Sequence, residues 1–462
     1  MAGRSGAGEH GCQPPRLGPS PVTNPQHPIT LSLRGRLAFA LNRLGEKLWA
    51  KPLLLCLVSL LGVWLAYLAD RLAPGLLLPD ISADTLETLL RIISSSMLVI
   101  AVFAAGSMLS AYASAGSTAT PRALAVVVAD DVSQYALSTF IGAFIFGIVA
   151  LIAQMNGLYG RTGRFALFLL TLVVLAVVLL SFVTWVDRIA RLGRVTNTIG
   201  RVEAVADLAL QERARQPTLG GRLLGPSPAV APGAEAAQPV LASGVGYLQR
   251  IDLGALQLLA QAAEAEIQVL CLPGAFITPA RALAQVEAQD SLPAEQLERI
   301  AQTFLIGDRR TFDDDPRFGL VVLSEIASRA LSPAVNDPGT AIHVIGSVVR
   351  LLTDWAQTSL EESRAPASAT RFGRLWLPEL ALEDLLEDGF AATARDGAAS
   401  LEVGLRLQKG LHQLSLLPLP ALRQAAMRQA ELALEHGELA LRLERERERL
   451  RRAAAWVLPP SG

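Results

Sequence analysis

The first half of the chain is built from long uncharged apolar stretches, and the second half mixes apolar and polar residues with helical and strand spacing. A helix needs roughly 20 apolar residues to cross the hydrocarbon core of a bilayer. Four stretches between residues 46 and 210 meet or nearly meet that length. We therefore predict a four-helix transmembrane domain over 46–210 and the lipid bilayer as a partner. The predicted spans are at about 52–70, 90–112, 134–157 and 165–187.

Basic residues gather on one side of the predicted spans. Those before the first span and after the fourth are Arg34, Arg36, Arg43, Lys47, Lys51, Arg188, Arg191, Arg194 and Arg201. The outer loops carry only Arg71, Arg91, Arg161 and Arg164. Because cytoplasmic flanks of spans are enriched in Lys and Arg, we expect both termini in the cytoplasm.

The second span carries serines at three- and four-residue steps, so their side chains share one helix face: Ser107, Ser110, Ser114 and Ser117. This face either lines a water-filled path or packs against another helix through small residues, and packing is the commoner use. No acidic or basic residue lies well inside a span. This argues against an active transporter, which usually needs buried ionisable groups, but leaves a passive pore open.

Composition changes along the rest of the chain. The Gly- and Pro-rich residues 1–45 predict a disordered tail, and residues 211–243 predict a flexible linker. Between them, the fourth helix is expected to continue toward Leu210. Residues 244–290 predict a small α+β unit and 291–462 a helical region, so the fold class is mainly α. Within these units we expect helices over Pro293–Leu305 and from Pro420 to about Ala455.

Two polar blocks, residues 307–320 and 330–341, stand out in the second half. Asp315-Pro316 and Asp337-Pro338 have the sequence of helix starts, since Asp caps free N–H groups and Pro fits the first helical position. Ser332-Pro333 ends the helix between them. The candidate polar site consists of Arg309, Arg310, Asp313, Asp314, Asn336 and Asp337.

Several interpretations of this site compete. Asp313, Asp314 and Asp337 with His343 would suit magnesium or manganese. Arg309 and Arg310 with the helix N-terminus at Pro316 would suit an anion. Caps and surface ion pairs explain the same residues without a ligand, and we assign no metal, no cofactor and no catalytic residue. The cysteines are isolated, which supports neither a zinc site nor a disulfide framework.

Charge excludes one class of partner. Lys+Arg number 41 and Asp+Glu 42, so the net charge of -1 gives no bulk field for nucleic acid.

The four spans, the segment 246–252 and the two polar blocks together resemble the predicted bacterial membrane proteins of domain of unknown function 2254. The resemblance covers roughly residues 40–430. It implies a multi-pass protein of the bacterial inner (plasma) membrane with a cytoplasmic C-terminal domain, and it implies no catalytic residues.

We therefore expect an integral inner-membrane protein of unknown biochemical activity. A non-enzymatic role is favoured, as a homo-oligomeric pore or scaffold with a cytoplasmic regulatory domain. The alternative is a membrane-anchored metal-dependent hydrolase acting at the cytoplasmic face, which rests on the acidic cluster alone.

Overall fold

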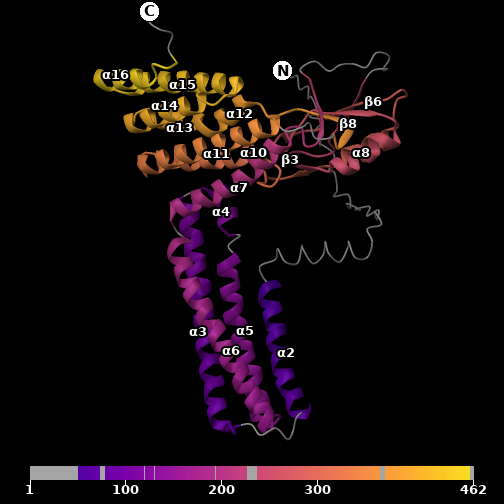
Figure 1. The fold of residues 1–462 in the computed structure, drawn as a ribbon, viewed down its shortest axis with the longest axis vertical. Helices are drawn as coiled ribbons and strands as arrows, with labels where there is room; N and C mark the ends of the chain where they lie inside the picture. The colour runs from indigo at the N-terminus through magenta and orange to yellow at the C-terminus, as the bar shows by residue number, and fades with distance from the viewer. Residues whose placement is uncertain are drawn as a thin grey trace, which may run out of the picture.

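Four apolar helices form a bundle at one end of the molecule (Figure 1). The computed structural model describes residues 50–72, 79–118, 120–128, 131–192, 194–225, 237–364 and 370–457, so the predicted tail 1–45 lies outside the described residues. The helices are α2 (Ala50–Leu72), α3 (Ala83–Thr118), α5 (Asp131–Met155) and α6 (Arg161–Leu192). Their candidate spans are Leu53–Leu72, Ala83–Ser114, Val132–Met155 and Arg161–Ile189, and the four predicted spans are confirmed.

Helix α5 is the centre of the bundle, because it packs against α2, α3 and α6. Half of its span window, 50%, is buried, compared with 11% for α2. Two glycines allow the close approach. A Cβ atom on Gly142 would lie 3.2 Å from Cβ of Leu55, and one on Gly147 would lie 2.5 Å from Oγ of Ser94. Small residues at helix crossings are the usual means of packing in a bilayer, where no hydrophobic effect drives helices together.

The outer faces of the spans are apolar and exposed, as in Leu54, Val99 and Leu180. Lipid is the solvent that such a surface requires. On α3, the buried positions Leu86, Leu90, Ile93, Met97, Ala101, Ala104 and Met108 form one face toward the bundle. The serine face lies beside this buried face: Ser107 and Ser114 are half-buried, Ser110 is exposed, and the side chain of Ser117 lies outside the described residues.

An unexpected polar contact closes the bundle at the end far from the extramembrane part. The carboxylate of Asp70, on α2, accepts hydrogen bonds from the N–H groups of Gly160, at 2.9 Å, and Gly163, at 3.0 Å. These N–H groups belong to the start of α6, where four backbone donors lack helical partners. Asp70 thus caps the fourth span from the first.

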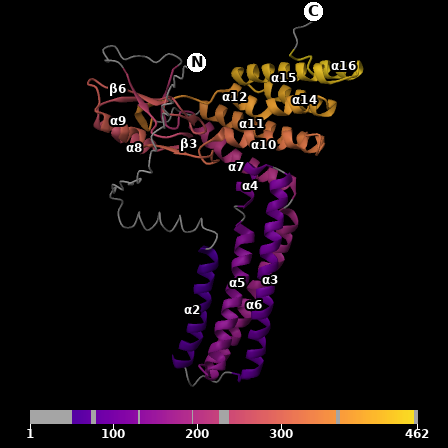
Figure 2. The ribbon, with the colours of Figure 1, turned by 180° about the vertical axis from the view of Figure 1, so that it is seen from behind.

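Two helices link the bundle to the extramembrane part. Helix α4 (Pro121–Val128) lies between the second and third spans, and α7 (Val195–Arg215) follows the fourth. The expected continuation of the fourth helix is interrupted, since α6 ends at Leu192 and a new helix begins at Val195. Figures 1 and 2 show α7 lying across the top of the bundle, beneath the stacked helices.

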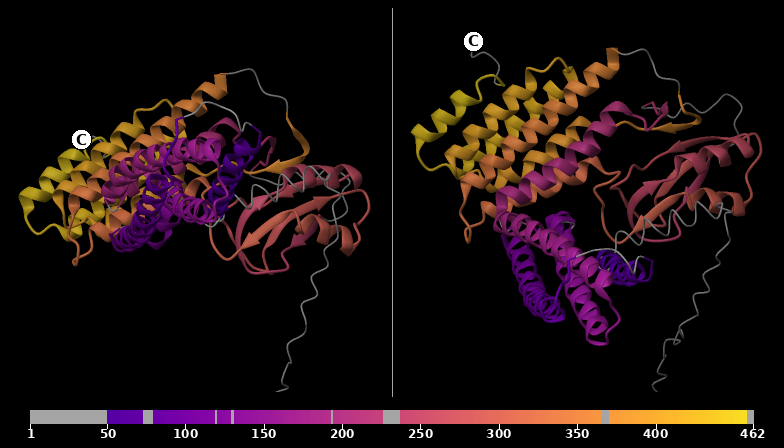
Figure 3. Two further views of the ribbon diagram at one scale, coloured as in Figure 1. Left: turned by 90° about the horizontal axis from the view of Figure 1, so that it is seen from below. Right: turned by 60° about the horizontal axis from the view of Figure 1, so that its bottom comes forward.

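The α+β unit stands beside the stacked helices (Figure 3). Its five-stranded sheet has the order β1-β8-β4-β6-β2, and its three-stranded sheet has the order β5-β3-β7. The strands are β1 (Gly221–Leu223), β2 (Gln238–Leu241), β3 (Gly246–Ile251), β4 (Glu266–Val269), β5 (Phe276–Ile277), β6 (Ala282–Glu287), β7 (Phe304–Gly307) and β8 (Phe372–Leu377). The helices are α8 (Leu253–Ala262) and α9 (Ala294–Ala301).

This unit is larger than the predicted range 244–290. Strand β8 pairs in parallel with both β4 and β1, and Leu375 and Leu377 are fully buried in the same core as Ile267. The predicted helix over Pro293–Leu305 is wrong at its end, because Phe304 and Leu305 pair with β3. The predicted linker 211–243 is wrong at its ends, which hold the last turn of α7, β1 and β2, while 226–236 lie outside the described residues.

The remaining helices stack in layers on α7 (Figure 3). They are α10 (Pro316–Ala330), α11 (Pro338–Arg364), α12 (Leu382–Leu386), the π-helical turn η1 (Glu387–Ala391), α13 (Ala392–Asp396), α14 (Leu401–Ser415), α15 (Pro420–Ala440) and α16 (Glu444–Ala453). The single long helix predicted from Pro420 to about Ala455 is wrong. It breaks after Ala440 because Leu441 and Leu450 are both buried, which brings α16 back against α14 and α15.

Candidate functional site

The two polar blocks lie at opposite ends of α10. Asp314 and Asp315 precede its first residue, whereas the N–H group of Asp337 donates to the carbonyl of Ala330, its last residue, at 2.8 Å. A helix of 15 residues is about 22 Å long. The metal site considered for Asp313, Asp314, Asp337 and His343 is therefore not assembled. Among the described residues, no group of three or more His, Cys, Asp or Glu side chains has the arrangement to hold a metal ion.

The block at the end of α10 is a turn and a helix cap. Asp337 accepts from the N–H group of Thr340 at 3.1 Å and from its hydroxyl at 2.6 Å, so the predicted cap is confirmed. These hydrogen bonds lower the pKa of Asp337. Asn336 has a φ of 50°, a left-handed conformation that Asn adopts more readily than most residues. Both residues thus have structural roles in the turn between α10 and α11.

The block at the start of α10 centres on a buried ion pair. Asp315 is 2% exposed, and its carboxylate accepts from Nε of Arg310 at 2.7 Å and from Nη2 at 3.0 Å. Burial raises the pKa of Asp315, against the opposing effect of Arg310 and of the N–H groups of Phe318 and Arg317. The predicted helix start at Asp315-Pro316 is confirmed, but the main partner of the carboxylate is Arg310, and no N–H group of the described α10 meets strict capping geometry with it.

Close packing fixes this ion pair in place. Gly274, with a φ of 96°, approaches so closely that a Cβ atom there would lie 2.4 Å from Oδ2 of Asp315. The guanidinium of Arg310 also lies over the ring of Phe318, 5.2 Å from its centroid. The pair therefore joins the α+β unit, through Gly274, to the start of α10.

The neighbouring charges of the block are more exposed. Oδ2 of Asp314 lies 3.5 Å from Nε of Arg250 on β3, and the two side chains are 39% and 72% exposed. Burial raises the pKa of Asp314, with Arg250 acting in the opposite direction. Arg309 pairs with Asp308 at 3.5 Å, and both are largely exposed. Asp313 is exposed as well.

A buried arginine near these carboxylates, Arg213, was not predicted from the sequence. It lies in the last turn of α7 and is 4% exposed, and its Nη1 atom has no hydrogen-bond partner among the described residues. Burial lowers its pKa to about 10, while Asp315 and Asp314 raise it. Helical spacing gives the signal: Val202, Ala206 and Leu210 form the buried face, and Arg213 follows three residues later on it.

A second fork of charges ties α10 to the π-helical turn. Arg317 donates through Nε to Asp388 at 2.6 Å and through Nη1 to Asp384. These hydrogen bonds and charges outweigh burial and raise the pKa of Arg317. Asp384 and Asp388 are four residues apart, at the two sides of the junction between α12 and η1. This fork was not predicted, because nothing local in the sequence links residues 317 and 388.

The arrangement is that of an ion-pair junction. The guanidinium of Arg310 is committed to Asp315, and Arg309 is exposed beside Asp308, so neither arginine is free for the anion site considered at Pro316. His343 is exposed on α11, beyond the other end of α10. The junction instead joins α7, β3, α10 and η1, which are elements distant in sequence.

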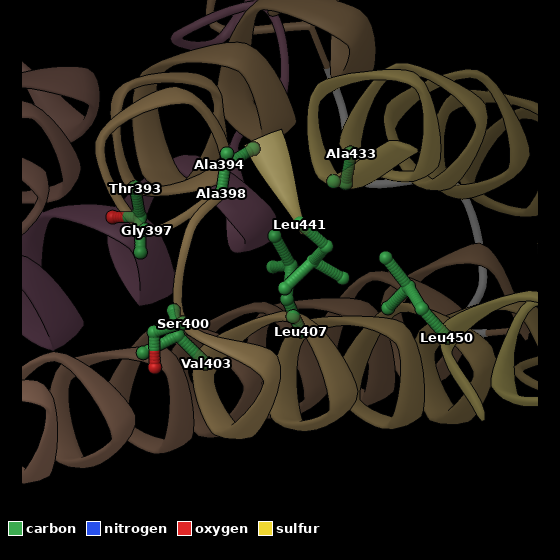
Figure 4. A pocket seen from close by; sticks show the side chains of 12 residues that line it. Thr393, Ala394, Gly397, Ala398, Ser400, Val403, Leu407, Ala433, Leu441 and Leu450 are labelled. Carbon is green, nitrogen blue, oxygen red and sulfur yellow. The ribbon is translucent and has the colours of Figure 1, made fainter. Parts of the chain in front are cut away.

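Of the charged residues around Asp315, Arg250 lines a hollow of about 460 Å³ beside β3 and α8, together with Asp252 and Thr303. Figure 4 shows an enclosed hollow between α13, α14, α15 and α16, lined by Thr393, Val403 and Leu450 among others. Its volume of about 10 Å³ is near the lower limit for one water molecule. Another hollow, of about 250 Å³, lies within the spans between α2, α5 and α6, and its lining is almost entirely apolar.

Comparisons with known proteins agree with this architecture. The family model described as "Predicted membrane protein (DUF2254)" matches residues 45–413. The uncharacterized protein Rv1290c of Mycobacterium tuberculosis is 33% identical over 168 residues, which is 35% of this chain and 32% of the relative. The uncharacterized protein Mb1321c of Mycobacterium bovis matches to the same extent. The matched segment is thus about a third of the relatives' length. No solved structure matches the chain.

Proposed function

From the premise that the chain belongs to the predicted membrane protein family of domain of unknown function 2254, we propose that it is a non-enzymatic protein of the bacterial inner membrane. It assembles as a homo-oligomer that serves as a scaffold or a passive pore. Its cytoplasmic domain regulates the assembly through direct contact with the spans.

The observation that carries this proposal is the packing of α4 and α7 between the spans and the stacked helices. Ala123 on α4 is fully buried in the same core as Ile199 on α7 and Leu323 on α10. Arg122 on α4 forms an ion pair with Glu325 on α10. A displacement of α10 therefore acts on both the loop between the second and third spans and the helix after the fourth.

The same packing supports the proposed orientation. Helix α4, between the second and third spans, and α7, after the fourth, contact each other at one end of the bundle. With the excess of Lys and Arg around the first and fourth spans, this favours a cytoplasmic location for both termini and for the α+β unit.

The exposed part of the serine face supports assembly. Ser110 is exposed on α3, and a Cβ atom on Gly106, one turn earlier, would meet no other atom within 4 Å. Hydroxyls and small residues facing lipid are well suited to contact a second copy. A test is disulfide cross-linking of Ser110→Cys in a chain whose Cys12, Cys56 and Cys271 are replaced by Ser. Leu180→Cys, on the outer face of α6 and 71% exposed, is the matched control for random collision.

Native mass spectrometry and planar-bilayer conductance of the purified full chain test the function itself. An oligomer that conducts supports the pore, and an oligomer that does not conduct supports the scaffold. A monomer that does not conduct would overturn both versions.

A further inference from the structure

We propose that Asp314 is the moving part of a two-position electrostatic switch, with Arg250 on β3 as its partner in the observed state and Arg213 on α7 as its partner in the other. The switch joins the α+β unit in one position and the helix that follows the fourth span in the other. This inference holds whether the oligomer is a pore or a scaffold.

Arg213 is a buried cation whose hydrogen-bonding capacity is not satisfied among the described residues. A buried charge without a close partner costs several kcal/mol, so it persists where another state of the protein uses it or where the surroundings compensate. Arg213 is more than nine-tenths buried, and in the described part of the chain it has no ion pair within 4.0 Å and no partner for Nη1. The anions whose charges act on it are Asp315 and Asp314.

Asp315 is not free to move toward Arg213. Arg310 holds both of its oxygens, and the backbone of Gly274 closes the space on one side of the carboxylate. The charge of Asp315 therefore stays at a fixed distance from Arg213. The carboxylate that can change its partner is that of Asp314.

Asp314 is held far less firmly. It has one ion pair, at 3.5 Å, with a side chain that is 72% exposed. Exposed pairs of this kind contribute little to stability, because solvent screens them and both side chains lose freedom. Asp313 beside it adds repulsion, and Arg213 already attracts it. A rotation of the loop before α10 would exchange a weak exposed pair for a buried one.

The exchange has a mechanical consequence. Arg213 lies in the last turn of α7, three residues before its C-cap Gln216, and strand β1 follows at Gly221. Pairing with Asp314 would tie this end of α7 to the start of α10, and release would let Asp314 hold β3 instead. The choice of partner thus changes which unit the start of α10 is tied to.

A thermodynamic cycle on the full chain in detergent micelles tests the switch by thermal unfolding. Arg213→Met should leave the unfolding midpoint unchanged or raise it, because it removes an unpaired buried cation. Arg250→Gln should lower it by less than about 2 °C, since Asp314 then moves to Arg213. The double variant should lose more than the sum of the two single variants, by up to about 2 °C, since neither partner remains and the exposed pair itself contributes little. Asp314→Asn should abolish that excess.

The matched control is Arg309→Gln, an exposed arginine of the same loop that pairs with Asp308, and it should combine additively with Arg213→Met. Three results would overturn the switch. They are additivity in the Arg250 double variant, equal non-additivity with Arg309→Gln, and a sharp loss from Arg213→Met alone, which would show that Arg213 is already paired. None of these results bears on oligomer formation, so the proposed function stands or falls separately.

Discussion

Gly319 on α10 and Ala206 on α7 meet so closely that a Cβ atom on Gly319 would lie 2.3 Å from Cβ of Ala206. No flexible side chain is available to move aside at this crossing. The glycine therefore sets the distance between the helix that follows the spans and the first helix of the stack. The coupling between the bundle and the extramembrane part depends on this contact.

Gly319→Ala should force α10 away from α7. Overpacking of a close contact costs about 1–3 kcal/mol, and we expect a loss in that range, measured as the midpoint of thermal unfolding of the full chain. Gly200→Ala on α7 is the control, because nothing lies within 4 Å of its added methyl group. It should be neutral or stabilise by up to about 1 kcal/mol. Equal effects from the two variants would mean that the crossing tolerates a wider spacing.

Asp70→Ala should loosen the first span from the fourth. The variant leaves the N–H groups of Gly160 and Gly163 without their charged acceptor, and hydrogen bonds to charged groups contribute about 1.5–3 kcal/mol. Asp80→Ala at the same end is the control. Asp80 is 56% exposed and lies 3.4 Å from Arg161, so its loss should change stability by less than about 1 kcal/mol. Unfolding in detergent followed by circular dichroism distinguishes them, and indistinguishable losses would argue against the cap.

The sequence predicts the bundle well because a bilayer imposes a length and forbids charge, and both can be read locally. It predicts the sheet poorly because pairing is not local. Strand β8 at Phe372–Leu377 pairs with Glu266–Val269, more than a hundred residues earlier. Neither segment has a sequence feature that indicates its pairing partner. The predicted end of the α+β unit at residue 290 is wrong for the same reason.

The candidate site shows the same division. The caps and the turn at Asn336 and Asp337 follow from residue type, since Asn tolerates a positive φ and Asp accepts N–H groups. The partners of Asp315 do not, because the same Asp-Pro sequence suits a cap or an ion pair. Arg310 lies only five residues before Asp315, but the sequence does not single out this pair among the charges of the loop, and only the fold places Arg213 in the interior.

Asp337→Ala should lose the cap of α11 and with it about 1 kcal/mol at neutral pH. The folded pKa of Asp337 lies below its ordinary value, so its contribution is present above that value and is lost as the pH falls through the folded pKa. The difference in unfolding midpoint between the parent and the variant should therefore shrink below about pH 4. Asp337→Asn keeps an acceptor for the N–H group of Thr340 and should lose less. A difference that stays constant down to pH 3 would show that the charge plays no part.

Leu450→Ala should release α16 from the stack. Leu450 is 1% exposed and fills the space over two glycines, since a Cβ atom on Gly437 would lie 2.3 Å from its Cδ2 and one on Gly404 would lie 3.1 Å from its Cδ1. Truncating a buried leucine costs about 2–5 kcal/mol.

Hydrogen exchange is the measurement suited to this variant, because it reports α16 separately from the rest of the chain. Amides of Glu444–Ala453 should lose protection in Leu450→Ala while those of α10 and α11 keep theirs. Leu439→Ala, at a side chain that is 88% exposed, should change neither. The ion pairs of Arg451 with Glu438 and Glu444 remain in both variants. If α16 stayed protected without Leu450, these pairs rather than apolar burial would be what holds it.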